Sequence, residues 1–201
     1  MKKLSLPIII IVISMVGYLV FTVKPADNQN GAVVEPSSTP TNGTPIDTSG
    51  WKTYRNEEYG FEVKYPSDWY LKNWPFTHEP QPNLPVGPIT FSNYDISALK
   101  TPFPQIPSWA KIDIYIAIKP QNWSLESSAE ENFLSPQRIK VSELDAIQGM
   151  RKPSDGEGGP PLQVFSTVFF TGNLVFSIGM IGDIEGQKDF YNHIVQSFKF
   201  I

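Results

Sequence analysis

The alternation of apolar and polar residues in the second half of the chain predicts a sheet-based domain. Residues 111–119 carry isoleucine at every second position, at 112, 114, 116 and 118, which is typical of a strand that buries one face. The runs 162–170 and 174–181 flank the turn sequence Thr171-Gly172-Asn173 and predict a β-hairpin. Shorter strands are predicted at 51–55, 60–65, 69–71, 89–92, 138–141 and 146–151.

Two segments follow the helical period instead. Leu125, Ala129 and Phe133 recur at a spacing of four behind Ser124, so a helix is predicted over 124–134 with Ser124 as its N-cap. Residues 186–197 carry a second apolar stripe behind carboxylates at 183 and 185, and the apolar tail 198–201 is expected to dock on the domain. Short turns join the neighbouring strands. We therefore expect the α+β class, with helices packed on a mainly antiparallel sheet.

The first 23 residues have the pattern of a membrane segment. The stretch 4–23 holds 15 apolar residues in 20 and no charge, and two lysines precede it. A helix of this length, roughly 30 Å, matches the hydrocarbon core of a bilayer. The run is longer than the apolar core of most cleaved signal peptides and lacks a small-residue cleavage site. We expect a single-pass signal anchor at 1–23, with a removed signal peptide as the alternative. The lysines predict a cytoplasmic N-terminus.

Composition divides the rest of the chain into a linker and one domain. Of the 27 residues 24–50, 17 are Pro, Ser, Thr, Gly or Asn and none is aromatic, which predicts a disordered stalk. Residues 51–201 hold 24 of the 26 aromatics, which is enough for one globular domain. The expected organisation is an anchor at 1–23, a linker at 24–50 and a domain at 51–201.

Charge and residue inventory exclude several functions. The net charge is −4 and no run of basic residues occurs, which argues against nucleic acid as a partner. The chain has no cysteine and two histidines, so we expect no thiolate or multi-histidine metal site and no cofactor. A serine-based hydrolase remains a remote alternative, because Ser177 lacks the Gly-x-Ser-x-Gly turn that exposes a nucleophile. We expect the protein not to be an enzyme.

A proline-rich insert at 73–110 offers candidate binding residues. Eight prolines fall within residues 73–107, and a loop of this length in a compact domain is unusual unless it has a function or is disordered. Its candidate ligand-binding residues are Trp74, Phe76, His78, Phe103 and Trp109. Such aromatics build a platform for a glycan or a peptide. The alternative is that they hold the loop onto the domain.

Motifs at both ends of the domain resemble those of PsbP-like domains. Tyr59-Gly60-Phe61 leads into a predicted strand that ends Tyr65-Pro66-x-x-Trp69, and residues 197–200 read Ser-Phe-Lys-Phe. The resemblance spans nearly all of 51–201 and implies an α/β/α sandwich around an antiparallel sheet. Members of this family include membrane-tethered bacterial proteins, and their roles differ, so it implies no catalytic residue here. The insert has no counterpart in the pattern, and the cysteine of the lipoprotein members is absent.

Anchor, stalk and resemblance together predict a membrane-anchored, extracytoplasmic module that acts in interaction or assembly at the cell envelope. Its partners would be the membrane, through the N-terminal helix, and an envelope protein that the sequence does not identify. A ligand-binding module that uses the insert's aromatics is the alternative.

Overall fold

The computed structural model describes residues 46–74, 80–81, 85–99, 104, 106–153 and 162–201. The chain divides into two compact units, and the described helices and strands all belong to the unit formed by 36–152 and 163–201. The predicted anchor at 1–23 and most of the predicted linker lie outside the described residues. Among the helices that the structure does describe, none is both long and apolar enough to cross a bilayer.

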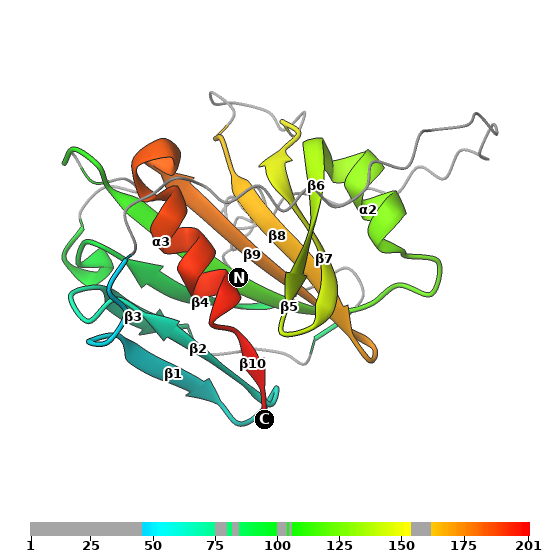
Figure 1. Ribbon diagram of the computed structural model, residues 1–201, viewed down its shortest axis with the longest axis horizontal. Coiled ribbons are helices and arrows are strands. Elements are labelled where there is room, and N and C mark those ends of the chain that lie inside the picture. Colours follow the sequence, from blue (N-terminus) through cyan, green and yellow to red (C-terminus); the bar gives the residue numbers. More distant parts are fainter. Residues whose placement is uncertain (1–45, 75–79, 82–84, 100–103, 105, 154–161) are drawn as a thin grey trace, which may run out of the picture. The chain divides into compact units, whose positions relative to one another are not determined.

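An antiparallel sheet of seven strands forms the centre of this unit (Figure 1), in the order β3-β4-β5-β9-β8-β7-β6. The strands are β3 (Tyr70–Asn73), β4 (Val86–Ser92), β5 (Ala110–Ile118), β6 (Phe133–Val141), β7 (Leu144–Arg151), β8 (Phe165–Thr171) and β9 (Leu174–Gly182). Strands β8 and β9 form the predicted hairpin, with Gly172 at φ 56° in its turn. The isoleucines of β5 at 112, 114 and 116 are at most 1% exposed, which confirms that they share the buried face.

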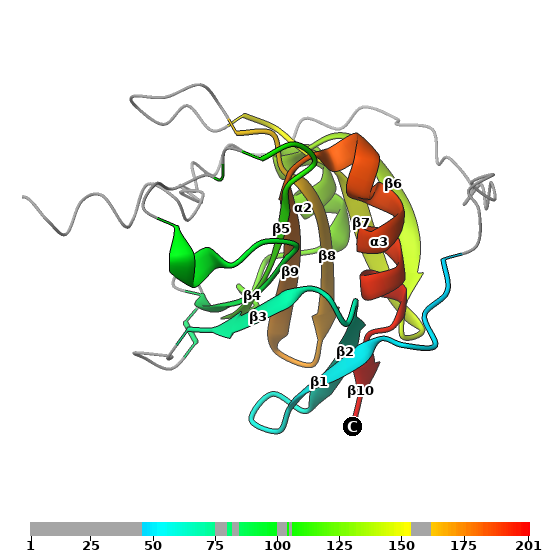
Figure 2. The same ribbon diagram turned by 90° about the vertical axis from the view of Figure 1, so that its left-hand side faces the viewer.

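A second, smaller sheet has the order β1-β2-β10 and was not predicted. It consists of β1 (Lys52–Asn56), β2 (Phe61–Tyr65) and β10 (Lys199–Phe200). The C-terminal tail therefore docks as predicted, and it does so as a strand antiparallel to β2. Figure 2 shows this small sheet beside β3, below the helix at 184–196.

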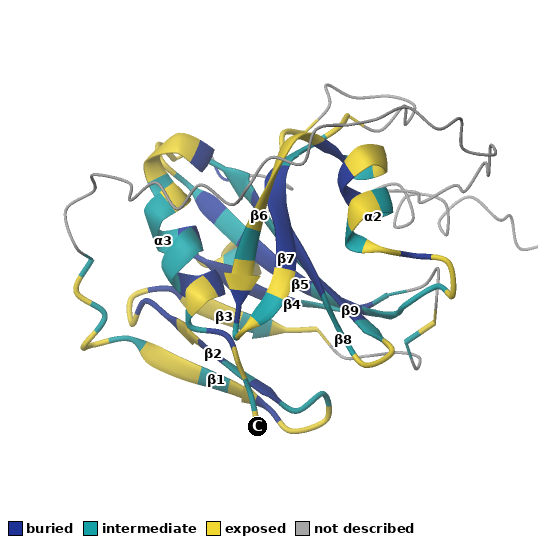
Figure 3. Cartoon of the chain, turned by 45° about the vertical axis from the view of Figure 1, so that its right-hand side comes forward, coloured by how far each residue is buried: buried dark blue, intermediate teal, exposed yellow. Residues whose placement is uncertain are grey.

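Two α-helices pack on opposite faces of the main sheet. Helix α3 (Ile184–Gln196) covers the face that carries the isoleucines, and α2 (Leu125–Asn132) packs against β6 and β7 on the other. A short 3₁₀ helix, η1 (Ile96–Ala98), follows β4. The predicted α+β class and mainly antiparallel sheet are confirmed. Figure 3 shows the central strands as mostly buried, whereas β1 and β6 are exposed.

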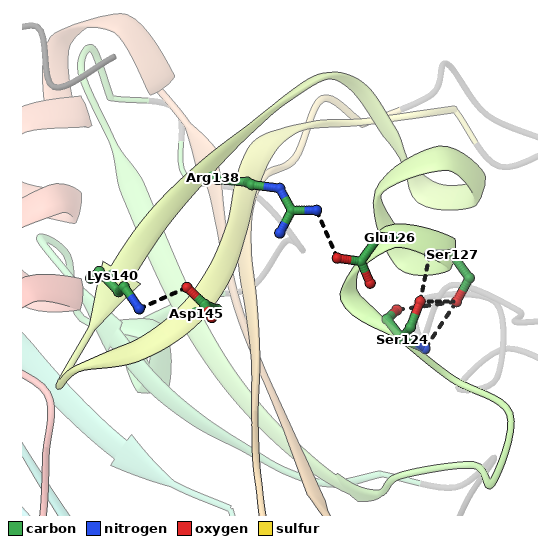
Figure 4. Close-up of polar contacts among 6 residues, drawn as sticks. All are labelled: Ser124, Glu126, Ser127, Arg138, Lys140 and Asp145. Carbon is green, nitrogen blue, oxygen red and sulfur yellow. Dashed lines mark hydrogen bonds and ion pairs between the residues drawn. The ribbon is translucent and has the colours of Figure 1, made fainter. Parts of the chain in front are cut away.

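Side-chain caps begin both helices; Ser124 is the N-cap that the sequence predicts, and Asp183, predicted as a carboxylate near the helix start, is the N-cap of α3. Ser124 and Ser127 form a reciprocal capping box at α2 (Figure 4), and Asp183 accepts a hydrogen bond from the Gly186 N–H at the start of α3. Helix α2 ends at Asn132, two residues earlier than predicted. Phe133 leaves the helix because it begins β6 and pairs with Arg151 of β7.

Aromatic rings join the two sheets into one core. Phe61 of β2 stacks on Phe198 with ring centroids 4.7 Å apart, and it meets Phe176 of the main sheet edge-on at 5.5 Å. All three side chains are at most 1% exposed. Burying each of these rings contributes roughly 2 to 3 kcal/mol. The small sheet is therefore held to the main sheet by packing as well as by the chain connection at residues 66–69.

A buried polar chain lies inside this core. The Gln148 side chain donates to Thr167 Oγ1 at 3.0 Å, and the Tyr191 hydroxyl lies 2.8 Å from both Thr167 Oγ1 and the Ile178 carbonyl oxygen. A carbonyl can only accept, so the single Tyr191 proton goes to Ile178 and the Thr167 hydroxyl donates to Tyr191. This chain links α3 to three strands of the sheet.

Candidate functional site

Of the five candidate residues, the structure describes Trp74 and Trp109, while Phe76, His78 and Phe103 lie outside the described residues. Trp74 directly follows β3, and its N–H donates to the Pro88 carbonyl at 3.4 Å. Its side chain is 39% exposed, and the Lys72 ammonium lies 4.0 Å from its ring centroid. One face of this ring therefore already binds a cation.

Trp109 directly precedes β5 and is partly buried. Its ring meets Tyr94 edge-on at 5.9 Å, and its carbonyl oxygen closely approaches Gly182, whose φ of 110° suits glycine. Trp74 contacts β4 at Pro88, whereas Trp109 lies beyond Asn93 at the other end of that strand. Five residues of strand span roughly 17 Å. The two tryptophans thus belong to different surfaces.

Trp74 lines a shallow hollow of about 270 Å³. The remaining lining residues come from β1, from the turn that follows it and from the end of β3: Tyr54, Arg55, Asn56, Glu57, Glu58 and Asn73. Asn56 shapes the turn, since its Oδ1 accepts the Tyr59 N–H at 2.9 Å and its amide donates to the Tyr54 hydroxyl at 3.1 Å. The hollow lies where the small sheet approaches the edge of the main one.

The charges around the hollow are mostly negative. Arg55 forms an ion pair with Glu57 at 3.5 Å, and these side chains are 56% and 84% exposed. Glu58 adds a second carboxylate beside this pair. Arg55 offsets the charge of Glu57, so the lining of the hollow keeps an excess of one negative charge, which attracts an incoming cation.

Strand β3 presents apolar side chains at an open edge of the main sheet. Tyr70 and Leu71 are 50% and 38% exposed, and no strand in the described part of the chain pairs with the outer side of β3. Hydrogen-bonded pairs alternate in an antiparallel ladder. The Trp74 N–H bonds to the Pro88 carbonyl, so residues 72 and 70, two and four positions earlier, also direct their backbone groups toward β4. The N–H and carbonyl groups of Leu71 and Asn73 are therefore directed outward.

The opposite edge of the sheet, β6, is protected against further pairing. Pro136 interrupts its hydrogen-bonding pattern, and a bulge lies between Leu134 and Gln137. Figure 4 shows two ion pairs along it, Arg138 with Glu126 at 2.7 Å and Lys140 with Asp145 at 2.8 Å. Proline, bulges and charged side chains are the devices by which proteins block sheet edges. Strand β3 contains neither proline nor bulge, and its one charged residue, Lys72, has its ammonium over the Trp74 ring.

The sheet face opposite α3 carries a polar cluster that the sequence analysis missed. Asp113 is 8% exposed; it accepts a hydrogen bond from the Thr90 hydroxyl at 2.7 Å and pairs with Lys111 at 2.7 Å. Burial, with a smaller contribution from the Asp113 charge, raises the pKa of Tyr94 to about 12. The same two causes raise the pKa of Tyr115 above the usual tyrosine value. The sequence pattern at 111–119 indicates this polar cluster, because residues 111, 113 and 115 share the strand face that carries no isoleucine.

Among the described residues, the polar side chains around Ser177 and His193 do not form a recognisable catalytic site. Ser177 lies inside β9 and accepts a hydrogen bond from the Arg151 guanidinium at 3.1 Å. Burial lowers the pKa of Arg151 to about 10, so it remains charged at neutral pH. His193 lies half-buried on α3 beside Trp51, and its Nδ1 is 2.8 Å from the Asp189 carbonyl. Within the described ranges, no three His, Asp or Glu side chains gather to hold a metal ion.

Comparison with known proteins finds similar solved structures but no similar sequence family. No family model matches the chain, and no curated protein does. A crystal structure from Bacteroides thetaiotaomicron VPI-5482 is 17% identical with a TM-score of 0.47; the match covers 76% of this chain and 49% of that one, so this chain spans about half its length. The solution structure of cyanobacterial PsbP (CyanoP) from Synechocystis sp. PCC 6803 is 9% identical with a TM-score of 0.47, covering 80% of this chain and 98% of that one. A PsbP is thus among the structures this chain resembles, as its sequence motifs predicted.

Proposed function

We propose that this protein is a membrane-anchored, extracytoplasmic interaction module that acts at the cell envelope without catalysing a reaction. The segment 1–23 is its single-pass anchor with a cytoplasmic N-terminus, and residues 24–50 form the stalk that carries the domain. The observation that carries this proposal is the open edge of β3. Its exposed apolar side chains lie beside a hollow, and its backbone groups face outward.

This edge has the composition of a protein-binding surface. Aromatic residues are enriched in the centres of protein interfaces, and Tyr70 and Trp74 are both substantially exposed here. A partner that covers them would also bond the outward backbone groups of β3, as in recognition by strand addition.

Site-specific photo-crosslinking in cells tests the proposal. A photoreactive residue replaces Tyr70 on β3 in one strain and Lys140 on β6 in a control strain. We expect one discrete crosslinked envelope protein from position 70 and none from position 140. Identical products from both positions, or no product from position 70, would refute a binding role for β3.

Protease treatment of spheroplasts tests the topology. We expect protease to digest residues 51–201 in intact spheroplasts, because the domain would lie outside the cytoplasmic membrane. Protection of the domain until the membrane is broken would refute the extracytoplasmic location.

A second candidate function is binding of a small ligand, such as a glycan, in the hollow. Trp74 supports it, because a partly exposed ring is a common sugar contact. The shallowness of the hollow and the occupation of one ring face by Lys72 favour the first proposal. Fluorescence titration with a glycan panel separates the two, with Trp74→Ala as the test and Trp109→Ala as the control. A saturable response lost only in Trp74→Ala would support the ligand.

A further inference from the structure

We propose that the outer edge of β3 accepts an extended, basic segment of the partner protein as an added strand, and that the basic side chains of this segment enter the hollow beside Glu57 and Glu58. This inference rests on the proposed interaction function and names the chemistry of the partner. It combines three features that lie together: an open strand, exposed apolar side chains and a hollow whose lining carries two carboxylates and one guanidinium.

The backbone of β3 provides the pairing groups. The backbone N–H and carbonyl groups of residues 70 and 72 face β4, so Leu71 and Asn73 offer two N–H donors and two carbonyl acceptors to a new strand. These are four hydrogen bonds at most, which is a modest number. Specificity must therefore come largely from the side chains on either side of the edge.

The side chains of an added strand alternate between the two faces of the sheet. Leu71 pairs with the buried Phe91, so the row through Leu71 and Asn73 lies on the face toward the small sheet, and Asn73 lines the hollow. Alternate residues of the added strand would lie over this row, near Glu57 and Glu58. Lysine or arginine at these positions of the added strand would complement the negative charge of the two glutamates.

The other row of the added strand meets a different surface. Tyr70 is exposed on that side, and the Lys72 ammonium lies 4.0 Å from the ring of Trp74, which also lines the hollow. A branched apolar side chain would cover Tyr70 without adding a second positive charge beside Lys72. The preferred segment thus alternates basic and apolar residues.

Charge favours a peptide over a lipid surface. Exposed tyrosine and tryptophan beside lysine also suit a membrane interface. Glu57 and Glu58, however, lie on the same edge and repel anionic headgroups, whereas they attract a basic peptide. We therefore assign the edge to a basic segment of a protein.

Fluorescence anisotropy with a defined peptide tests the assignment. The probe is a fluorescein-labelled octapeptide of alternating lysine and valine, titrated with the full chain in mild detergent. The control peptide has glutamate in place of lysine. We expect saturable binding of the lysine peptide, at least about tenfold tighter than the glutamate peptide and weaker at high salt, because screening reduces the attraction between exposed charges. No binding, or equal binding of both peptides, would overturn the proposal.

Two sets of variants separate backbone pairing from side-chain contact. Leu71→Pro removes an outward N–H but no bond to β4, and Leu71→Ala keeps that N–H while shortening the side chain. We expect about tenfold weaker binding for Leu71→Pro than for Leu71→Ala. The exposed substitutions Glu57→Gln and Glu58→Gln should each weaken binding about threefold, and they test the proposal even if the proline variant does not fold. Equal affinity of the two Leu71 variants when both fold, or unchanged affinity of both glutamine variants, would refute it.

Lipid provides a further test. The same titration is repeated with the full chain in phosphatidylcholine nanodiscs, where we expect unchanged affinity. Loss of binding there would place β3 against the membrane and overturn the assignment. The crosslinking experiment tests the proposed function separately: if position 70 captures no protein, the interaction function is refuted. If position 70 captures a protein but the lysine peptide does not bind, only the proposal of an added basic strand is refuted.

Discussion

Removing one buried hydroxyl, with Tyr191→Phe, tests the polar chain inside the core. The Tyr191 side chain is 0% exposed, and its hydroxyl is 2.8 Å from both the Thr167 hydroxyl and the Ile178 carbonyl oxygen. The substitution keeps the ring and its packing but deletes both hydrogen bonds. Burial is the main reason that the pKa of Tyr191 is raised, so the group is a neutral hydrogen-bonding partner throughout the physiological range.

The expected cost follows from what each partner loses. A net contribution of about 1 kcal/mol per hydrogen bond gives about 2 kcal/mol for the pair. The Ile178 carbonyl still accepts from the Ser166 hydroxyl at 3.0 Å, so it is not orphaned, whereas the Thr167 proton loses its acceptor. We therefore expect Tyr191→Phe to lower the free energy of unfolding by about 2 kcal/mol.

Urea denaturation of the full chain, followed by circular dichroism, measures this change. The matched control is Tyr65→Phe, because Tyr65 is also largely buried but its hydroxyl makes no hydrogen bond with any described residue. The control should cost under about 0.5 kcal/mol. The double variant Tyr191→Phe with Thr167→Val should cost clearly less than the sum of its single variants, because both members of a hydrogen bond are then apolar. A loss below about 0.5 kcal/mol for Tyr191→Phe, or strict additivity, would refute the reasoning.

Three further perturbations test other parts of the fold. Gly182→Ala should destabilise by about 3 kcal/mol, because its φ of 110° is strained for alanine and its Cβ would strike the Trp109 carbonyl; Gly50→Ala, with open space around it, is the control in thermal melts. Asp183→Ala should cost about 1 kcal/mol in the same melts through loss of the α3 N-cap, and Asp183→Asn should restore most of it. Stability should fall as pH rises from about 10 to about 12, because folded Tyr94, like Tyr115 and Tyr191, keeps a proton that the unfolded chain loses; the fall should be smaller in Tyr94→Phe, and an unchanged slope there would contradict this.

Local patterns predicted most of the main sheet because one face of each long strand is buried. The isoleucines of β5 made this visible, and the turn at Gly172 identified the hairpin. The small sheet was not predictable in the same way. Strand β10 has two residues, too few to show a period, and its partner β2 lies at the other end of the domain. The end of α2 was missed because Phe133 continues the helical spacing of Leu125 and Ala129 while its backbone pairs with β7.

The candidate site was predictable only in part for a related reason. Aromatic composition makes Trp74 a candidate, but the hollow beside it depends on Glu57 and Glu58, which belong to the turn after β1 and carry no local sequence signal of a site. Tertiary packing brings that turn to the end of β3. The outward direction of the Leu71 backbone depends on the register with β4, which no local signal determines. Sequence composition therefore nominates Trp74 as a candidate, and the fold places two carboxylates and the edge of β3 beside it.

The pairing of β10 with β2 determines when the domain can complete its folding during synthesis. The Lys64 N–H of β2 donates to the hydroxyl of Ser197, which lies two residues before β10 and 133 residues after Lys64. At about 5 to 20 residues per second, the ribosome needs on the order of ten seconds to deliver the second segment after the first. During that time Phe61 lacks the ring of Phe198 that covers it in the finished domain. The nascent chain should consequently expose this ring to holdase chaperones until synthesis reaches β10.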